Sequence, residues 1–558
     1  MANEIICQGR SWTTFRDIGR EIWLLAICLC ALFVVGPAAG SSRSPLRPRP
    51  NFVLLQTDDQ ARWDLGVMNK TVALIAQQGV SFTNYMVNTP ICCPSRAEIF
   101  SGRYFHNVGG PGGSCMHVDA EDAVFNEHSL FSSLQSAGYQ TGAFGKLTND
   151  QNHFFCSKKR ADGLSMIGSP CNVGVYYPTK YFIKLPNGTK YFENLDSNDP
   201  ATYLTAQLGN RTINWITQLA GNSPLAAPFF AYIGPHAPHL PAEPAPWEEE
   251  DRFEGITAPR TPSWNVSCPD KHGFIAKNPP LDENATDFLD QQHRDRHMSL
   301  LAVDDVIKAV YTTLEKLDLL ESTYIITTSD HGYHLGQWRV PSSKRLPYDT
   351  DIFVNTFIRG PGIKPGSEQA AMVGNTDIAP TILDLAGVEI PPLMDGKSMA
   401  QLIISSDNPY YDLALRQQAV PWREAYLIQY HMTSANTNSD ASMWFPGTGV
   451  FHGTQLYPPA RPCKTCPPWM LDGPENTYRA LRLRNATHNI LYAEFNVHFD
   501  FSNASAIFYE FYDVTEDPYQ VKNTYGSVPK AARENYRSQL ETFSACAGGQ
   551  GHLEGNCP

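Results

Sequence analysis

The chain has 558 residues, of which 42% are hydrophobic and 18% are charged, a composition that allows a globular protein with a substantial core. Its formal net charge of −13 excludes the broad basic surface that nucleic-acid binding requires, although a small basic pocket remains compatible with it. The length suits either several domains or one large α/β domain with a smaller one.

The first 40 residues have the layout of a secretory signal peptide. Arg10, Arg16 and Arg20 precede an apolar run over 22–40, and small residues follow Pro37. We predict cleavage at the end of this run. An uncleaved anchor is the alternative, because the run is long enough to span a bilayer. A polar, proline-rich leader follows over 41–50.

Two further features are typical of an exported protein. Asn-x-Ser/Thr sequons predict a glycoprotein, with candidates at Asn69, Asn187, Asn210, Asn265, Asn284, Asn485 and Asn503. Ten of the 13 cysteines follow the three in the signal region, and setting aside the adjacent Cys92 and Cys93 leaves eight, which predicts disulfides of unknown connectivity. These eight are Cys115, Cys156, Cys171, Cys268, Cys463, Cys466, Cys546 and Cys557. Cys463-x-x-Cys466 would also suit half a zinc site, but with no second Cys/His pair at ligand spacing we favour a disulfide or loop role.

Four short apolar runs each end in ionisable residues. They end at Asp58-Asp59, at Lys146, at His236 and His239, and at Asp330-His331. Helical stretches lie between them, at 70–78, 128–137, 202–219 and 287–319. This pattern predicts an α/β fold with a mostly parallel sheet covered by helices on both faces. Because ligands bind beyond the carboxyl ends of such strands, we expect a shared site there. Asp and His acting only as turn formers is the plainer alternative.

The pattern changes after residue 405. Residues 432–476 are rich in Gly, Pro, Ser and Asn, which predicts a long loop, and three alternating runs over 478–514 predict antiparallel strands. A helix is expected at 530–544, before a Gly-rich tail. We therefore predict a large α/β catalytic domain over 51–405 and a smaller C-terminal α+β subdomain over 406–558, with an antiparallel sheet, a long loop and a flexible tail.

The stretch NTPICCPSRAEIFSGRY, over 88–104, carries a candidate nucleophile. Pro94 suits the first turn of a helix and Gly102 suits its end. Cys92 would therefore lie at or just before a helix N-terminus, where partial positive charge favours anions and lowers the pKa of a thiol. Arg96, one turn along, adds a permanent cation. A buried structural pair of cysteines is the alternative.

The CxPSR motif at 92–96, followed by SGR at 101–103, resembles the signature of the sulfatase family. The resemblance extends from about residue 51 to the C-terminus and is strongest to the branch of N-acetylglucosamine-6-sulfatases and algal arylsulfatases, which also has a Cys-Cys doublet and the pattern YDVTEDPYQVKN. It implies an alkaline-phosphatase-like fold. It also implies hydrolysis of sulfate monoesters, of aryl sulfates or 6-sulfated amino sugars, with release of inorganic sulfate. Cys92 would be oxidised to formylglycine during export, by formylglycine-generating machinery.

The resemblance assigns further roles to matched positions. One divalent metal, usually Ca²⁺, would be held by Asp58, Asp59, Cys92, Asp330 and His331. His331 stands where many relatives have Asn, which leaves the identity of the metal slightly open.

Four more residues match family positions around the substrate. Arg96, Lys146 and Lys344 would neutralise the sulfate group, and His239 would protonate the leaving group. His236 receives a supporting or structural role. Thr148 stands where relatives often carry a histidine.

Two other functions stay open beside sulfate-ester hydrolysis. One is a phosphonate or phosphate ester hydrolase of the same superfamily, and the other is a non-catalytic secreted binding glycoprotein. The expected partners are a small-molecule or carbohydrate sulfate ester and the formylglycine-generating machinery, with no nucleic acid and no stable membrane span if the signal is cleaved. We expect a protein of the secretory pathway that ends in an extracellular, periplasmic or cell-wall, or lysosomal location. Specificity would come from loops at 109–124, 152–187 and 432–476.

Overall fold

The four apolar runs lie next to one another in the centre of a ten-stranded sheet, in the order β9, β1, β8, β4. All three of these contacts are parallel, so the carboxyl ends of the four strands meet at one edge, as predicted. The sheet is mixed overall, since β12 pairs antiparallel with β9 and with β2, and β6 pairs antiparallel with β5 and β7. In spatial order the strands are β13 (Ser367–Gln369), β2 (Val80–Phe82), β12 (Thr356–Arg359), β9 (Thr323–Ser329), β1 (Asn51–Thr57), β8 (Phe229–Gly234), β4 (Gln140–Gly145), β5 (Met166–Pro170), β6 (Lys180–Lys184) and β7 (Lys190–Asn194).

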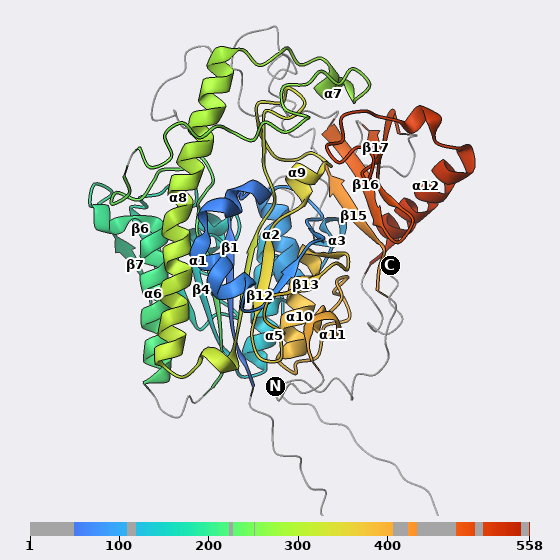
Figure 1. Cartoon of the computed structure of the whole chain (residues 1–558). Helices are drawn as coiled ribbons and strands as arrows, with labels where there is room; N and C mark the ends of the chain where they lie inside the picture. Colours follow the sequence, from blue (N-terminus) through green and yellow to red (C-terminus); the bar gives the residue numbers. More distant parts are fainter. Residues whose placement is uncertain are drawn as a thin grey trace, which may run out of the picture. The chain divides into compact units, whose positions relative to one another are not determined.

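Helices cover both faces of this sheet, which confirms the predicted fold class. Every residue of β1, β8 and β9 is buried. Phe52 and Leu54 pack into one apolar cluster, and Val53 and Leu55 into another. The first cluster contains residues of α2 (Cys92–Ser101), α5 (Leu130–Ser136) and α10 (Ile378–Leu385), and the second contains residues of α6 (Leu204–Ala220) and α8 (Glu283–Lys316) (Figure 1). This two-sided burial explains why the strands are unbroken apolar runs in the sequence.

This computed structural model describes residues 49–108, 119–221, 227–249, 251–405, 422–431, 476–496, 506–547 and 557. The predicted signal peptide, most of the leader, most of the 432–476 loop and most of the tail lie outside these residues. So do Cys115, Cys463, Cys466 and Asn503. None of the helices within the described ranges has the length and apolar character needed to cross a membrane.

The sequence missed part of the sheet. Residues 152–187 were expected to form a specificity loop, but β5 and β6 lie within this range, and β7 follows them. The helix expected at 70–78 is divided into a short α-helix, α1 (Asn69–Thr71), and a π-helix, η2 (Val72–Ala76). The shorter helices are α3 (Phe105–Val108), α4 (Ala120–Phe125), α7 (Gly273–Ala276), α9 (Asp349–Ile352) and α11 (Ala400–Ile403). Two small sheets pair β10 (His334–Leu335) with β11 (Ser342–Ser343) and β14 (Val373–Gly374) with β3 (Tyr85–Met86).

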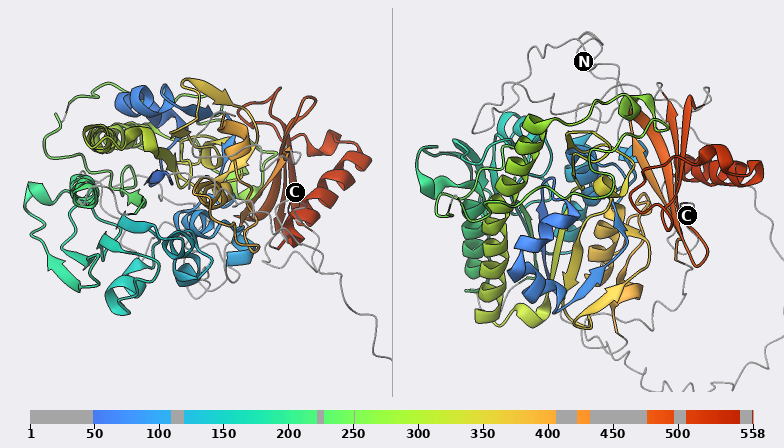
Figure 2. Two further views of the ribbon diagram at one scale, coloured as in Figure 1. Left: turned by 90° about the horizontal axis from the view of Figure 1, so that it is seen from below. Right: turned by 45° about the horizontal axis from the view of Figure 1, so that its top comes forward.

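A separate antiparallel sheet forms the C-terminal part, as predicted. It consists of β15 (Ala425–Tyr430), β16 (Thr477–Arg484), β17 (Asn489–Asn496) and β18 (Phe508–Asp513), and α12 (Lys530–Ala545) packs on it (Figure 2). The sequence missed β15. Met86 and Tyr104 pack in one cluster with Tyr426 and Leu427 of β15, which joins this sheet to the elements around α2. The domain boundary near residue 405 stays a prediction.

Two disulfides join described residues, Cys156–Cys171 and Cys546–Cys557. The predicted grouping of the cysteines was wrong in two places. Cys93 is disulfide-bonded rather than unpaired, and Cys268 is a free, buried thiol. Sequence spacing could not show that Cys93 forms a disulfide and Cys268 does not, because disulfide pairing depends on which Cβ atoms the fold brings together.

Candidate active site

Cys92 is the first residue of α2, at the centre of the candidate site. Ile91 before it is extended, and the helix ends at Gly102, whose φ of 65° is in the left-handed region and whose N–H donates to Glu98 O at 2.8 Å. Every residue of α2 is buried. The thiol therefore lies at a buried helix N-terminus, as predicted, where unpaired N–H groups favour negative charge.

Two lysines set the charge around this thiol. Lys344 Nζ lies 3.1 Å from Cys92 Sγ and also donates to Asp59 Oδ1, and Lys146 Nζ donates to Asp58 Oδ2 at 2.6 Å. Burial by itself would raise the pKa of Cys92, but Lys146 and Lys344 outweigh this effect and lower it. A group that carries negative charge at this position is therefore stabilised.

Three carboxylates converge beside Cys92. Asp58 and Asp59 follow β1, and Asp330 follows the neighbouring β9. Asp59 has a left-handed backbone with φ of 67°, and its N–H donates to Asp330 Oδ1 at 2.9 Å. The turn after β1 thus directs two successive carboxylates towards one point.

These residues fit a divalent cation. The ligand atoms of Asp58, Asp59, Cys92, Asp330 and His331 all lie within 4.8 Å of one another. Among the described residues, the buried atom Asp58 Oδ1 has no hydrogen-bond partner, which is what a metal ligand without its ion would show. His331 Nε2 lies 3.1 Å from Asp59 Oδ1 and 3.6 Å from Asp330 Oδ1. Burial lowers the pKa of His331, but Asp330 and Asp59 raise it to about 10, so the cluster attracts positive charge. Carboxylate oxygens favour a hard cation.

Arg96 holds the cluster together. Its Nε donates to Asp330 Oδ2 at 2.9 Å, and its Nη1 donates to Lys146 O at 2.7 Å and to Tyr232 Oη at 2.8 Å. Nη2 lies 3.6 Å from Asp58 Oδ1. None of the hydrogen bonds that Arg96 makes to described residues goes to Cys92, so its guanidinium orients the carboxylates.

Two histidines from the segment after β8 complete the site. His236 is buried, and its Nδ1 lies 3.1 Å from Asp58 Oδ2. His239 Nε2 lies 3.8 Å from Asp59 Oδ2, and this side chain is 26% exposed. Since Lys146 and Lys344 are almost fully buried, His239 marks the accessible side of the site. Thr148 is buried and contributes no hydrogen bond from its hydroxyl among the described residues.

The structure thus brings together all of the predicted site residues. Sequence reasoning missed Tyr232, which accepts a hydrogen bond from Arg96 and whose hydroxyl lies 2.9 Å from Gln56 Oε1. A tyrosine within an apolar strand carries no signal beyond its hydroxyl, which must find a partner when buried. It also missed Asn375, which donates to Ser95 Oγ at 3.0 Å and to Glu98 in α2.

The predicted absence of another Cys/His pair at ligand spacing was also wrong. His293 and His297 are four residues apart on α8, and both lie beside Asp64. This cluster is separate from the one around Cys92.

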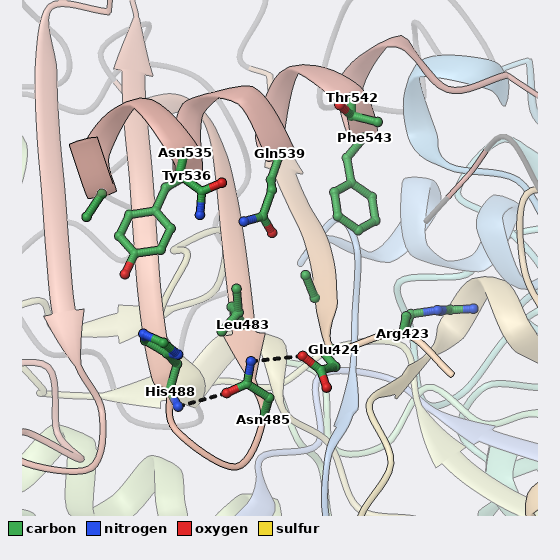
Figure 3. A pocket seen from close by; sticks show the side chains of 12 residues that line it. Arg423, Glu424, Leu483, Asn485, His488, Asn535, Tyr536, Gln539, Thr542 and Phe543 are labelled. Atoms are coloured by element: carbon green, nitrogen blue, oxygen red, sulfur yellow. Dashed lines mark hydrogen bonds between the residues drawn. The ribbon is translucent and has the colours of Figure 1, made fainter. Parts of the chain in front are cut away.

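A pocket of about 490 Å³ lies elsewhere, between the C-terminal sheet and α12, and Asn485, His488, Tyr536 and Phe543 are among its lining residues (Figure 3). None of the predicted catalytic residues lines it. Asn485, a sequon asparagine, donates from Nδ2 to Glu424 Oε2 at 2.8 Å.

The other described sequons differ in accessibility. Asn69, Asn187, Asn210 and Asn284 are exposed. Asn265 hydrogen-bonds the backbone of Leu281 through both its amide nitrogen and its amide oxygen, which leaves it less available for modification.

A buried thiol at a helix N-terminus, surrounded by carboxylates, lysines and a histidine at the carboxyl edge of an α/β sheet, is the arrangement expected of a hydrolase of anionic esters. The comparisons with known proteins identify the family. The sulfatase family model matches residues 50–388. N-acetylglucosamine-6-sulfatase of Homo sapiens is 31% identical over 544 residues, which cover 94% of this chain and 89% of the relative. The arylsulfatase of Volvox carteri is 30% identical over 414 residues, 65% of this chain and 59% of the relative.

Solved structures share the fold. BT4656, solved in complex with its substrate D-glucosamine-2-N,6-O-disulfate, has a TM-score of 0.60 at 21% identity, covering 88% of this chain and 97% of that chain. A phosphonate monoester hydrolase from Silicibacter pomeroyi has a TM-score of 0.57 at 20% identity, and the match covers 89% of this chain and 96% of that chain. The chain belongs to the sulfatase family, and it is a sulfuric ester hydrolase that acts on sulfate esters.

Proposed function

We propose that Cys92 is converted to formylglycine and that its hydrated form is the nucleophile of a sulfatase. The observation that carries this proposal is the position of Cys92, at a buried helix N-terminus with Lys344 Nζ at 3.1 Å and Asp59 Oδ1 at 3.6 Å from its sulfur. The β-carbon of residue 92 would carry the aldehyde in place of the thiol. Because that carbon stays at the same helix mouth, the same basic groups would face the diol that water forms from the aldehyde.

The reaction would then proceed in two steps. One hydroxyl of the diol releases its proton to solvent and attacks sulfur, and the bond between sulfur and the alcohol oxygen breaks while His239 delivers a proton to that oxygen. The second hydroxyl returns a proton to His239, the bond between the residue and the sulfate breaks, and the aldehyde forms again. The balance is one ester and one water consumed, with one alcohol and one sulfate released.

The basic residues would stabilise the charge that builds on the sulfate group. Lys146 pairs with Asp58, and Lys344 pairs with Asp59. Each lysine could turn from its carboxylate to an oxygen of the sulfate group. Arg96 would keep Asp58 and Asp330 in place, because its hydrogen bonds and its ion pair already go to groups of the site.

Asp58, Asp59, Asp330 and His331, with residue 92, would hold one divalent cation, which we propose to be Ca²⁺ because carboxylate oxygens predominate. When bound, a divalent cation supplies Lewis-acid stabilisation of the attacking oxygen.

The proposed substrates are aryl sulfates or 6-sulfated amino sugars. The support comes from relatives, since N-acetylglucosamine-6-sulfatase covers almost the whole chain and a fold neighbour binds D-glucosamine-2-N,6-O-disulfate. Disulfides between described residues fit folding in the secretory pathway, and the final compartment stays a prediction.

Peptide mass spectrometry across residue 92 tests the proposed nucleophile, and rates with p-nitrophenyl sulfate, 6-sulfated N-acetylglucosamine and a phosphonate monoester test the substrate class. We expect an aldehyde at residue 92 and turnover of sulfate esters, both lost in Cys92→Ala with unchanged folding. An unmodified cysteine in an enzyme that still hydrolyses sulfate esters would reject the formylglycine mechanism. Faster turnover of the phosphonate would favour the second candidate, a phosphonate ester hydrolase with this fold.

A further inference from the structure

We propose that Asp64, His293 and His297 form a second metal site, which binds Zn²⁺ and lies outside the candidate active site. His293 and His297 are four residues apart on α8, so both side chains project from one face of this helix. Asp64 approaches them from η1 (Arg62–Val67), the short helix after β1. Two histidines at this spacing on a helix are a recurrent zinc-binding arrangement.

The distances between the three ligand atoms suit an ion better than hydrogen bonds. Asp64 Oδ1 lies 3.7 Å from His293 Nδ1 and 3.6 Å from His297 Nε2, and all three atoms are within 4.8 Å of one another. These separations are too long for hydrogen bonds. The two distances from Asp64 Oδ1 are close to the roughly 3.3 Å that separates ligands around tetrahedral zinc with bonds of about 2.0–2.1 Å.

All three atoms are buried, and none has a hydrogen-bond partner among the described residues. Their side chains are 0%, 5% and 9% exposed for Asp64, His293 and His297. A buried polar atom without a partner costs free energy, so three that converge on one point require an explanation. One cation between them would satisfy all three.

The rest of the site orients Asp64 and selects the type of ion. Asp64 Oδ2 accepts hydrogen bonds from Ala61 N, at 3.0 Å, and from Arg296 Nη2, which leaves Oδ1 directed at the histidines. Only one carboxylate oxygen of Asp64 is therefore free to bind an ion. A hard cation such as Ca²⁺ needs several oxygens, whereas two imidazoles and one carboxylate oxygen suit Zn²⁺.

Arg296 also connects this cluster to the candidate active site. Its Nη2 donates to Asp59 O at 2.6 Å, and its Nη1 donates to Pro238 O at 3.3 Å. An ion on Asp64 would fix Arg296 and, through it, the turn that carries Asp59. The site would therefore act as a structural brace for the active site.

The test uses the full-length purified protein, stripped with EDTA and titrated with Zn²⁺ or with Co²⁺, whose visible absorption reports tetrahedral coordination. Three variants separate the two sites. His293→Ala/His297→Ala removes the proposed ligands, Asp330→Asn weakens the cluster around Cys92, and His153→Ala removes a histidine whose side chain is 59% exposed. We expect wild type, Asp330→Asn and His153→Ala each to bind one zinc tightly in the titration and to show the cobalt bands.

The double histidine variant should lose both the zinc and the bands, and its melting temperature should no longer rise with added Zn²⁺. Equal zinc content in this variant and wild type would overturn the proposal. X-ray absorption at the zinc edge of wild type is the second measurement, and it does not depend on whether the variant folds. Two imidazole nitrogens without sulfur support the site, while sulfur ligands or the absence of bound zinc overturn it.

Discussion

Replacement of Lys344 by methionine should remove the positive charge nearest to the nucleophile while most of the side-chain volume stays. The Lys344 side chain is 6% exposed, its Nζ lies 3.1 Å from Cys92 Sγ, and it donates to Asp59 Oδ1. Methionine has an unbranched side chain of similar length, so it can occupy the same space.

The size of the effect follows from burial. Loss of one preorganised group that stabilises charge in the transition state costs about 2.7–4 kcal/mol, which is about 10²–10³ in kcat. Water cannot easily replace the ammonium group at a position this buried, so we expect a value in the upper half of this range. KM should change less, because the charge on the sulfate group increases as the transition state forms.

Initial rates with p-nitrophenyl sulfate measure this loss. Lys364→Met is the matched control, because Lys364 is exposed and should tolerate the change. Mass spectrometry of residue 92 and thermal melting show whether each variant is modified and folded. A folded, modified Lys344→Met enzyme with kcat within about threefold of wild type, a barrier change well below 1 kcal/mol, would refute the reasoning.

Three further predictions concern the metal and two titrating groups. EDTA should abolish turnover and Ca²⁺ should restore it, and full activity at undetectable metal content would contradict the proposed cation site. Burial lowers the pKa of His239 below 6.5; Lys344 acts in the same direction and Asp59 opposes both. The protonated form of His239 is therefore lost as the pH rises through this lowered pKa. Turnover of a sugar sulfate should therefore decline with rising pH. His239→Asn should slow the hydrolysis of a sugar sulfate more than that of p-nitrophenyl sulfate, whose leaving group needs little protonation. Equal slowing of both reactions would show that His239 is not the proton donor. Burial raises the pKa of Glu98 to about 8, although hydrogen bonds from Thr89 and Asn375 act in the opposite direction. The folded protein therefore binds this proton more tightly than the unfolded chain, whose Glu98 has a pKa of 4.5. The stability that Glu98 contributes is complete below pH 4.5 and is lost as the pH rises towards about 8. Glu98→Gln should flatten this fall in melting temperature, and an unchanged pH profile would show that Glu98 ionises normally.

The residues of the candidate site could be predicted because their positions are local to strand and helix ends. Asp58-Asp59, Lys146 and Asp330-His331 each follow a strand directly, and neighbouring parallel strands bring such ends to one edge. Cys92 was predictable in the same way, from Pro94 and Gly102 around a short helix.

The exchange of roles among the cysteines was not predictable. Cys93 forms a disulfide and Cys268 does not, although neither spacing nor neighbouring residues distinguish them. The strand β7 was missed because none of its residues is buried, and β5 was missed because it contains Gly168 and Pro170, two residue types that are depleted in strands.

By itself, the sequence determined the α/β class, the position of Cys92 at the start of a helix and the charged residues at the strand ends, because each depends on a few neighbouring side chains and on backbone propensity. Only the tertiary structure decided which of these groups form hydrogen bonds and ion pairs with one another. Arg96 donates hydrogen bonds to Asp330, Tyr232 and two backbone carbonyls, and Asp64 meets His293 and His297 across a long stretch of chain. Such contacts depend on side-chain direction and on packing between distant segments, and no local pattern encodes them.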